Sequence, residues 1–198
     1  MKKYLLLLII PFLSFGQTET KKEYYENGNL RSVTQFDENY DKINVQFYSN
    51  DGILYQELNY KNGKRHGVKK IWHKNGKIKI ETHYINDKEN GSYREWHENG
   101  QIKKEGQIID ESDSSGYFNK NGTWREWYEN GQMKTLKIYV NGKFEGEHTN
   151  WYKNGQIKSV HQWKNDKYYG THKWWDENGN LTAEERFNNA GFLIYEWP

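Results

Sequence analysis

The sequence contains no cysteine, and proline occurs only twice in 198 residues. Without cysteine the chain can form neither a disulfide framework nor a thiolate zinc site. It also contains no nucleophile elbow, phosphate-binding loop, zinc-protease motif or catalytic pair of carboxylates. These absences favour a protein that is not an enzyme, has no cofactor, and is stabilised by backbone hydrogen bonds and packing.

Apolar residues are also scarce. They make up 34% of the chain, and the mean hydropathy is −1.20. Values this low are typical of disordered chains, but nine Trp and sixteen Tyr supply bulky side chains that disordered chains rarely contain. Together with 18 glycines, this composition predicts a folded, turn-rich β protein with a thin core.

The first sixteen residues differ from the rest of the chain. Two lysines precede an apolar run, Leu5 to Phe15, and Ser14 and Gly16 are small residues at positions −3 and −1 of a cleavage site. This pattern predicts a signal peptide over 1–16, with 17–198 as a single domain exported to the periplasm, the cell surface or the medium. An uncleaved N-terminal anchor is the alternative, which the short apolar run disfavours.

The predicted mature chain has no net charge. Without the two lysines of the signal peptide, 27 basic residues balance 27 acidic ones, with histidine counted as neutral. A balanced chain has no general electrostatic attraction to nucleic acid. We therefore expect no nucleic-acid partner and, once the signal peptide is removed, no transmembrane segment.

One turn motif recurs through the whole chain at a fixed interval. Its glycine returns every 24 residues, with one interval of 31, at Gly28, Gly52, Gly76, Gly100, Gly131, Gly155 and Gly179. Numbered from this turn glycine, position −4 is always aromatic, position +2 is Leu, Ile or Met, and position +8 is aromatic in six of the seven copies. The pattern indicates an array of repeated β-hairpins.

The pairing within each hairpin follows from the turn type. A three-residue loop with glycine as the left-handed bulge residue places position −4 opposite +2 on one face, as in Trp127 with Met133. The same register pairs Glu126 with Lys134 and, further from the turn, Trp124 with Leu136. Cross-strand pairing favours such charge-complementary and apolar pairs. We predict an all-β fold, an elongated, open, single-layer antiparallel meander of about fourteen strands in seven repeats.

The repeat resembles a known family. The segments WHKNGKIKIETHYINDKENG (72–91) and WYKNGQIKSVHQWKNDKYYG (151–170) are similar to the MORN repeat, and more closely to its bacterial variant; the resemblance covers residues 24–187. It implies an elongated β-sheet that serves as a scaffold or binding surface without catalysis of its own. Bacterial proteins of this type are often labelled antitoxins, and standard MORN repeats, whose loop is richer in glycine, have been linked to phospholipid binding.

Alternation along the strands separates the aromatic residues into two sets. The set at position −4 is expected to form the packed core with the residues at +2: Trp72, Trp96, Trp127, Trp151 and Trp175 on Ile78, Ile102, Met133, Ile157 and Leu181. A second set is expected on the opposite face: Phe47, Tyr55, Tyr93, Trp124, Tyr128, Tyr152 and Trp174. Exposed aromatic rings can stack on sugars or centre a protein interface, and ordinary cross-strand packing is the alternative.

A row of cations is expected on the same face as the second set: Arg31, Lys79, Lys103, Lys134 and Lys158. Equivalent residues in successive repeats are two strands, roughly 9.5 Å, apart. Acidic residues lie opposite three of these cations, which favours a salt-bridged, solvated surface, but Lys79 and Lys158 have no acidic partner in this register. The candidate partner-binding residues are Trp124, Trp174, Tyr93, Tyr128, Tyr152, Lys79 and Lys158.

Two further features of the sequence, an insertion and a set of histidines, are candidate metal sites. The one long interval implies a seven-residue insertion within 108–117 (IIDESDSSGY), whose acidic residues suggest calcium ligands but lack the EF-hand spacing, so that a tolerated insertion is the simpler interpretation. His73 and His97 share one repeat position and His148 and His172 another. Each pair is then roughly 9.5 Å apart, which is too far for one zinc ion. We therefore expect no metal site.

These observations predict an exported, non-enzymatic repeat protein that serves as a scaffold or recognition surface, with another protein as its partner. One alternative is an envelope or glycan-binding module that uses the aromatic face, with anionic lipid as a further ligand of the basic row. The other alternative is an antitoxin or immunity protein that neutralises a toxin.

Overall fold

The computed structural model describes residues 19–109 and 119–197. The predicted signal peptide lies outside the described residues, and so does the predicted insertion from residue 110 onward. Every described element is a strand: β1 (Glu19–Tyr24), β2 (Leu30–Phe36), β3 (Lys42–Tyr48), β4 (Leu54–Lys61), β5 (Lys64–Trp72), β6 (Ile78–Ile85), β7 (Lys88–Trp96), β8 (Ile102–Ile109), β9 (Asn119–Trp127), β10 (Met133–Val140), β11 (Lys143–Phe144), β12 (Gly146–Trp151), β13 (Ile157–Lys164), β14 (Lys167–Tyr168), β15 (Gly170–Trp175), β16 (Leu181–Phe187) and β17 (Leu193–Trp197). The described residues include no helix long and apolar enough to cross a membrane.

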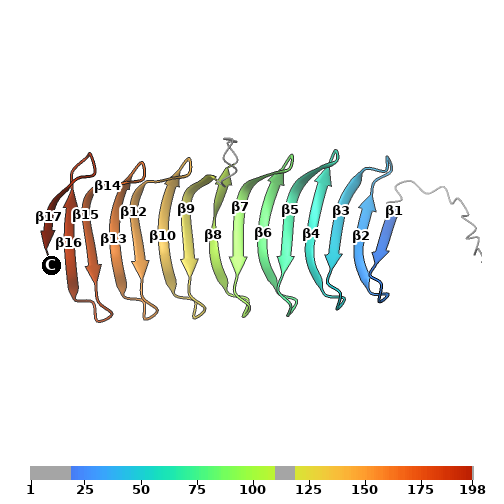
Figure 1. Cartoon of the computed structure of the whole chain (residues 1–198), viewed down its shortest axis with the longest axis horizontal. Helices are drawn as coiled ribbons and strands as arrows, with labels where there is room; N and C mark the ends of the chain where they lie inside the picture. The colour runs from blue at the N-terminus through green and yellow to red at the C-terminus, as the bar shows by residue number, and fades with distance from the viewer. Residues whose placement is uncertain (1–18, 110–118, 198) are drawn as a thin grey trace, which may run out of the picture.

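The 17 strands form one open antiparallel sheet in the order of the sequence (Figure 1). β11 and β12 share one row beside β10, and β14 and β15 share one row beside β13. The seven repeats therefore supply the predicted fourteen rows, and β17 adds one more beside β16. The predicted all-β class and the open, single-layer meander are confirmed.

Each repeat closes in the predicted three-residue loop. In the fifth repeat the N–H of Gly131 donates to the carbonyl of Tyr128, and the N–H of Tyr128 donates to the carbonyl of Gln132, both at 2.9 Å. Gly131 has a φ of 84°, in the left-handed region that glycine adopts without a steric penalty. Trp127 lies opposite Met133, so the register next to the turn is as predicted.

Beyond this first pair the predicted register is wrong by one residue. Lys134 is skipped in the pairing, so that Glu126 lies opposite Thr135, and Trp124 lies opposite Lys137 instead of its predicted partner. The other six turn hairpins contain a shift at the same place. A β-bulge of this kind places two residues of one strand against one of the other and increases the local twist.

The two faces of the sheet are separated as predicted, but the buried face is not the expected one. We name them the spine face, which carries Trp124, and the stripe face, which carries the tryptophans at position −4. Every buried hydrophobic side chain of the described residues lies on the spine face, namely Val45, Leu58, Tyr84, Ile108, Trp124 and Tyr139. On the stripe face Ile157 is 40% exposed and Leu181 36%. The prediction that the position −4 stripe forms the core is therefore wrong.

From β7 to β16 the spine face is covered by aromatic rings that contact one another in series, and Trp124 on β9 contacts Tyr93 on β7 across Gly106 of β8. The rings of this aromatic spine are Tyr93, Trp124, Tyr139, Phe144, Trp163, Tyr168 and Phe187. Neighbouring centroids lie between 4.3 Å (Trp163 to Tyr168) and 6.4 Å (Trp124 to Tyr139), the range of tilted and edge-to-face ring pairs. In a sheet only one layer thick, such contacts along the sheet replace the second layer of a sandwich.

Gly106 on β8 makes room for the most buried tryptophan. A Cβ at Gly106 would overlap the indole ring of Trp124, which is 4% exposed. The indole N–H donates to the carbonyl of Gln107 at 3.1 Å, so this buried polar group has a partner. His148 and His172 occupy the same repeat position, and their Nε2 atoms lie 2.9 and 3.0 Å from the equivalent carbonyl of the preceding repeat.

Candidate recognition surface

The seven turns lie side by side at one end of the strands, which we name the turn edge (Figure 1), and an asparagine joins five of them to the next turn; the second turn carries Asp51 at this position. Asn130 at position −1 accepts the N–H of Gln132 at 3.2 Å within its own turn. Its Nδ2 donates to the carbonyl of Lys153 in the next turn at 3.0 Å. Asn27, Asn75, Asn99 and Asn154 make the same two bonds. The Asn of the turn motif therefore shapes its own loop and also ties it to its neighbour.

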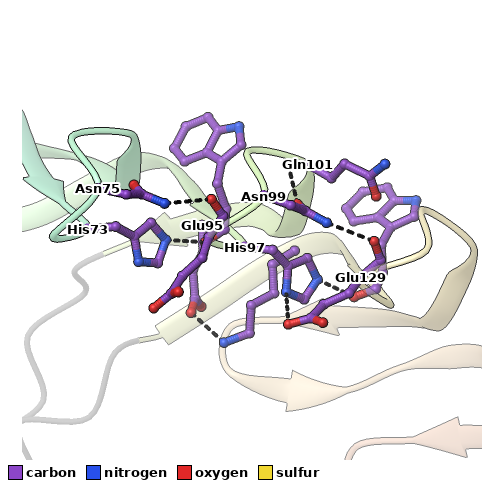
Figure 2. A network of polar contacts seen from close by, with 11 residues as sticks. His73, Asn75, Glu95, His97, Asn99, Gln101 and Glu129 are labelled. Atoms are coloured by element: carbon purple, nitrogen blue, oxygen red, sulfur yellow. Dashed lines mark hydrogen bonds and ion pairs between the residues drawn. The ribbon is translucent and has the colours of Figure 1, made fainter.

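A second set of bonds along this edge comes from position −3. The hydroxyls of Tyr128 and Tyr152 donate to the carbonyl of position −4 in the next repeat, at 2.8 and 2.9 Å. His73 and His97 make the equivalent contact through Nε2, at 2.9 and 3.0 Å, as Figure 2 shows. Because a carbonyl can only accept, Nε2 carries the hydrogen in both histidines. These residues hold successive turns at a fixed spacing.

The histidines singled out in the sequence therefore have structural partners. His73 and His97 join turns, whereas His148 and His172 are buried on the spine face, 2% and 0% exposed. Figure 2 also places Glu129 beside His97, with Nδ1 3.9 Å from the carboxylate, a distance that makes an ion pair only with a protonated imidazole. No group of three or more potential metal ligands occurs within 19–109 and 119–197.

Three lysines lie over Tyr128 and Tyr152 of the turn edge. The ammonium groups of Lys134 and Lys153 are 5.8 and 5.9 Å from the ring centroid of Tyr128, and that of Lys158 is 5.4 Å from the ring of Tyr152. These distances are within the range of cation–π attraction. We name these five residues the lysine–tyrosine row. A groove of about 200 Å³ beside Tyr128 is lined by both lysines that contact this ring.

The nearby carboxylates Glu95 and Glu126 are engaged by other lysines, whereas the exposed Glu129 lines the same groove, with Nδ1 of His97 3.9 Å away. Glu95 accepts from Lys103 at 2.7 Å, which is the predicted pair, although the backbone register places Glu95 opposite Lys104. Glu126, predicted to face Lys134, instead pairs at 2.8 Å with Lys104, which lies opposite it on β8. Burial acts to raise the pKa of Glu126, but the hydrogen bond and charge of Lys104 outweigh it and leave the pKa lowered. Lys134 is thus left over the ring of Tyr128 without a direct carboxylate partner among the described residues.

The seven predicted partner-binding residues do not lie together. Trp124 is buried and Tyr93, 5.6 Å from it, belongs to the aromatic spine, so the predicted exposure of Trp124 is wrong. Trp174 is half-buried on the same face, 5.1 Å from the ring of His161. The bulky rings of Trp124 and Tyr93, which strand alternation placed on the face opposite the stripe, belong to the core. Tyr128, Tyr152 and Lys158 belong to the lysine–tyrosine row, and Lys79 is exposed two repeats away with no partner among the described residues.

A cluster of histidines on the spine face was missed by the sequence reasoning. Nδ1 of His161 lies 3.2 Å from Nδ1 of His172, and the ring of His148 packs on the spine rings Phe144 and Trp163. Burial, followed by the charges of His172 and His148, lowers the pKa of His161 to about 4. Burial also lowers the pKa of His148 and His172 against the opposing effect of their backbone hydrogen bonds. The signal in the sequence was the recurrence of His at position −7, where Trp124 stands.

The match to a known family agrees with this geometry. The model of the MORN repeat variant matches seven segments, at 20–38, 43–62, 65–86, 89–110, 120–141, 144–165 and 168–189. Each segment covers one hairpin of the sheet, and together they span nearly all of the described residues. A comparison with curated proteins gives no match. The repeat period, the open single-layer sheet and the seven matched segments show that the chain belongs to the MORN repeat variant family.

Proposed function

We propose that this protein is an exported, non-enzymatic scaffold that binds another protein along the lysine–tyrosine row. The observation that carries the proposal is the placement of exposed lysines over tyrosine rings in successive repeats. The hydroxyls of Tyr128 and Tyr152 are bonded to the next turn, so these rings are fixed before a partner arrives. A prearranged surface loses less side-chain entropy on binding. The signal-like segment 1–16 supports export.

The spacing of the row indicates the kind of partner. Equivalent residues in neighbouring repeats are roughly 9.5 Å apart. A polyproline II segment advances about 3.1 Å per residue, so every third side chain returns to the same side after about 9.3 Å. Lys134 and Lys158 are equivalent residues at position +3. An extended partner segment with an acidic residue at every third position therefore matches the row in charge and in spacing.

Charge reversal tests this proposal. The double variant Lys134→Glu, Lys158→Glu should lose the proteins captured from an envelope extract by the unaltered chain, and should lose affinity for a synthetic acidic peptide of the stated pattern. The matched control is Lys143→Glu, Lys164→Glu, which reverses the charge of two exposed lysines at the other end of the strands, away from the turn edge. Equal capture by both double variants would contradict the proposal, and so would a wild-type chain that captures nothing.

A groove at the first two repeats favours glycan binding as a second candidate function. Its volume is about 800 Å³, and its lining includes Tyr24, Phe47 and Tyr55 together with Arg31 and Glu26. The rings of Phe47 and Tyr55 lie 6.4 Å apart. Aromatic rings that stack on sugar faces, beside charged groups that bind hydroxyls, are suited to a glycan. Retention on insoluble glycans that disappears in Tyr55→Ala would support this candidate, and no retention of the wild-type chain would rule it out.

A further inference from the structure

The strand β17, at one end of the sheet, carries large exposed apolar side chains on both of its faces. Ile194 is 65% exposed, and Leu193, Tyr195 and Trp197 are each more than two-fifths exposed. Phe192, in the turn before β17, is 70% exposed. Glu196 is the only charged residue of the strand. A run of large apolar side chains with this exposure is unusual for a surface that faces only water.

The outer side of the β17 backbone also has no strand partner among the described residues. Within the described part of the chain, β17 pairs with β16 alone and β1 pairs with β2 alone. The two edges differ in composition, because β1 reads ETKKEY and carries four charges, whereas β17 reads LIYEW. Charged side chains on an edge strand oppose pairing with another chain, and an apolar edge invites it.

The direction of the edge strands determines how two copies of the chain can pair. The rows alternate in direction from β1 to β17, and their number is odd, so both edge strands run the same way. Stacking copies head to tail would therefore join β17 to the charged β1 of the next copy in a parallel pair. Two copies related by a two-fold axis instead join β17 to β17 as an antiparallel pair, which is the more stable ladder per residue.

We propose that this protein self-associates through β17, so that two copies form one continuous sheet across a two-fold axis. Tyr195 and Trp197 lie two residues apart and share one face of the strand. With the axis perpendicular to the sheet, the same two rings of the second copy lie on that face beside them. Tyr195 is already fixed, since the guanidinium of Arg186 lies 4.8 Å from its ring and is bonded to Glu184 at 2.7 Å.

The short length of β17 determines the expected strength of the association between two copies. A ladder of five residues per copy with its flanking side chains buries less than about 1,200 Å², the size of weak and transient interfaces. The dimer should therefore dissociate in the micromolar range, and its formation should depend on concentration. This association does not involve the lysine–tyrosine row, so either proposal can fail without the other.

Sedimentation velocity of the chain over roughly a hundredfold range of concentration around 10 μM tests the association. The wild-type protein should shift from monomer to dimer, and Ile194→Lys should remain a monomer. The matched control is Ile85→Lys, which places the same charge at an exposed isoleucine (46%) of an interior row, and should behave as the wild type. A wild-type chain that stays monomeric overturns the proposal and leaves β17 to another partner, and oligomers larger than dimers overturn the two-fold arrangement.

Cross-linking provides a second readout that does not depend on affinity. Because the chain has no cysteine, a single introduced cysteine can form only an intermolecular disulfide. Tyr195→Cys, at the centre of β17, should give a disulfide-linked dimer under mild oxidation, whereas Thr20→Cys on β1 should not. Equal cross-linking of both variants, or of neither, would contradict pairing through β17. Circular dichroism should show the strand content of the wild type in every variant.

Discussion

The two faces of this sheet are built from alternate residues of the same strands, yet they differ in how they are stabilised. On β9, Trp124 is 4% exposed and bonded through its indole N–H, whereas Trp127, three residues later, lies half-buried on the stripe face. The spine face gains a series of rings in contact, and the stripe face carries one aromatic residue at position −4 per repeat beside ion pairs such as Arg125 with Glu105. In a single-layer sheet, side-chain contact along the sheet decides which face is the core.

The largest expected difference between the faces is in stability. Trp124→Ala should lower the free energy of unfolding by about 3–5 kcal/mol, because it removes a buried ring and leaves a cavity over Gly106. Trp127→Ala should cost about 1–2 kcal/mol, since only part of that ring leaves water on folding. Urea unfolding followed by circular dichroism measures both. A larger loss in Trp127→Ala would reverse the assignment of the core.

The second expected difference is in the response to acid. The spine histidines have lowered pKa values in the folded state, so the unfolded chain binds more protons as the pH falls below about 6.5. Their contribution is complete above that pH and is lost toward the pKa of His161, about 4. Between pH 7 and pH 5 the loss should be about 2 kcal/mol from His161 alone.

Urea unfolding at the two pH values measures this loss, and His161→Gln should reduce it. A wild-type chain whose stability does not fall between pH 7 and pH 5 would show that the spine histidines are not held neutral by burial.

The third difference concerns the close contact beneath Trp124. Gly106→Ala should destabilise the sheet by about 1–3 kcal/mol, because the added methyl group overlaps the indole ring. In a Trp124→Phe background, Gly106→Ala should destabilise the sheet less, since the smaller phenyl ring leaves room for the added methyl group. A double-mutant cycle measures this coupling, and purely additive losses would mean that the two residues are not in contact.

The smallest expected effect is at the lysine–tyrosine row. Lys158→Ala should change the free energy of unfolding by no more than about 0.5 kcal/mol, because an exposed lysine over a ring contributes little to folding. Affinity for the acidic peptide should nevertheless fall. Isothermal titration beside urea unfolding separates the two quantities. Loss of stability without loss of affinity would assign Lys158 a structural role.

The repeat period and turn chemistry were sufficient to predict the fold, and alternation placed Trp127 and Trp124 on opposite faces. Beyond the bulge alternation failed, because Leu136, predicted to share a face with Trp124, lies opposite Arg125 on the stripe face. The register failed one residue beyond the turn, because a bulge at Lys134 leaves no mark in the composition of the strand. The buried face was assigned wrongly because position −4 is aromatic in every repeat, whereas the core residues at −7 vary between Trp124, His148 and other types. The residue types that recur in every repeat therefore lie next to the turns, whereas the residue types of the core vary from repeat to repeat.

The candidate site was predictable only in part. Tyr128, Tyr152 and Lys158 were selected from the sequence and are placed together by the turn edge. Lys134 was predicted to pair with Glu126, which instead pairs with Lys104. The bonds from each turn to the next join residues 21 or more positions apart, such as Tyr128 and the carbonyl of Trp151, and only the packing of neighbouring repeats reveals them.

Hydrogen exchange of the indole N–H groups tests the identity of the buried face most directly. In two-dimensional NMR spectra of the 15N-labelled chain, assigned through single Trp→Phe variants, the indole proton of Trp124 should exchange slowly, because it is buried and bonded to the carbonyl of Gln107. The indole proton of Trp127 should exchange rapidly from the half-buried stripe face. Rapid exchange at Trp124 together with protection at Trp127 would contradict the account and restore the stripe as the core.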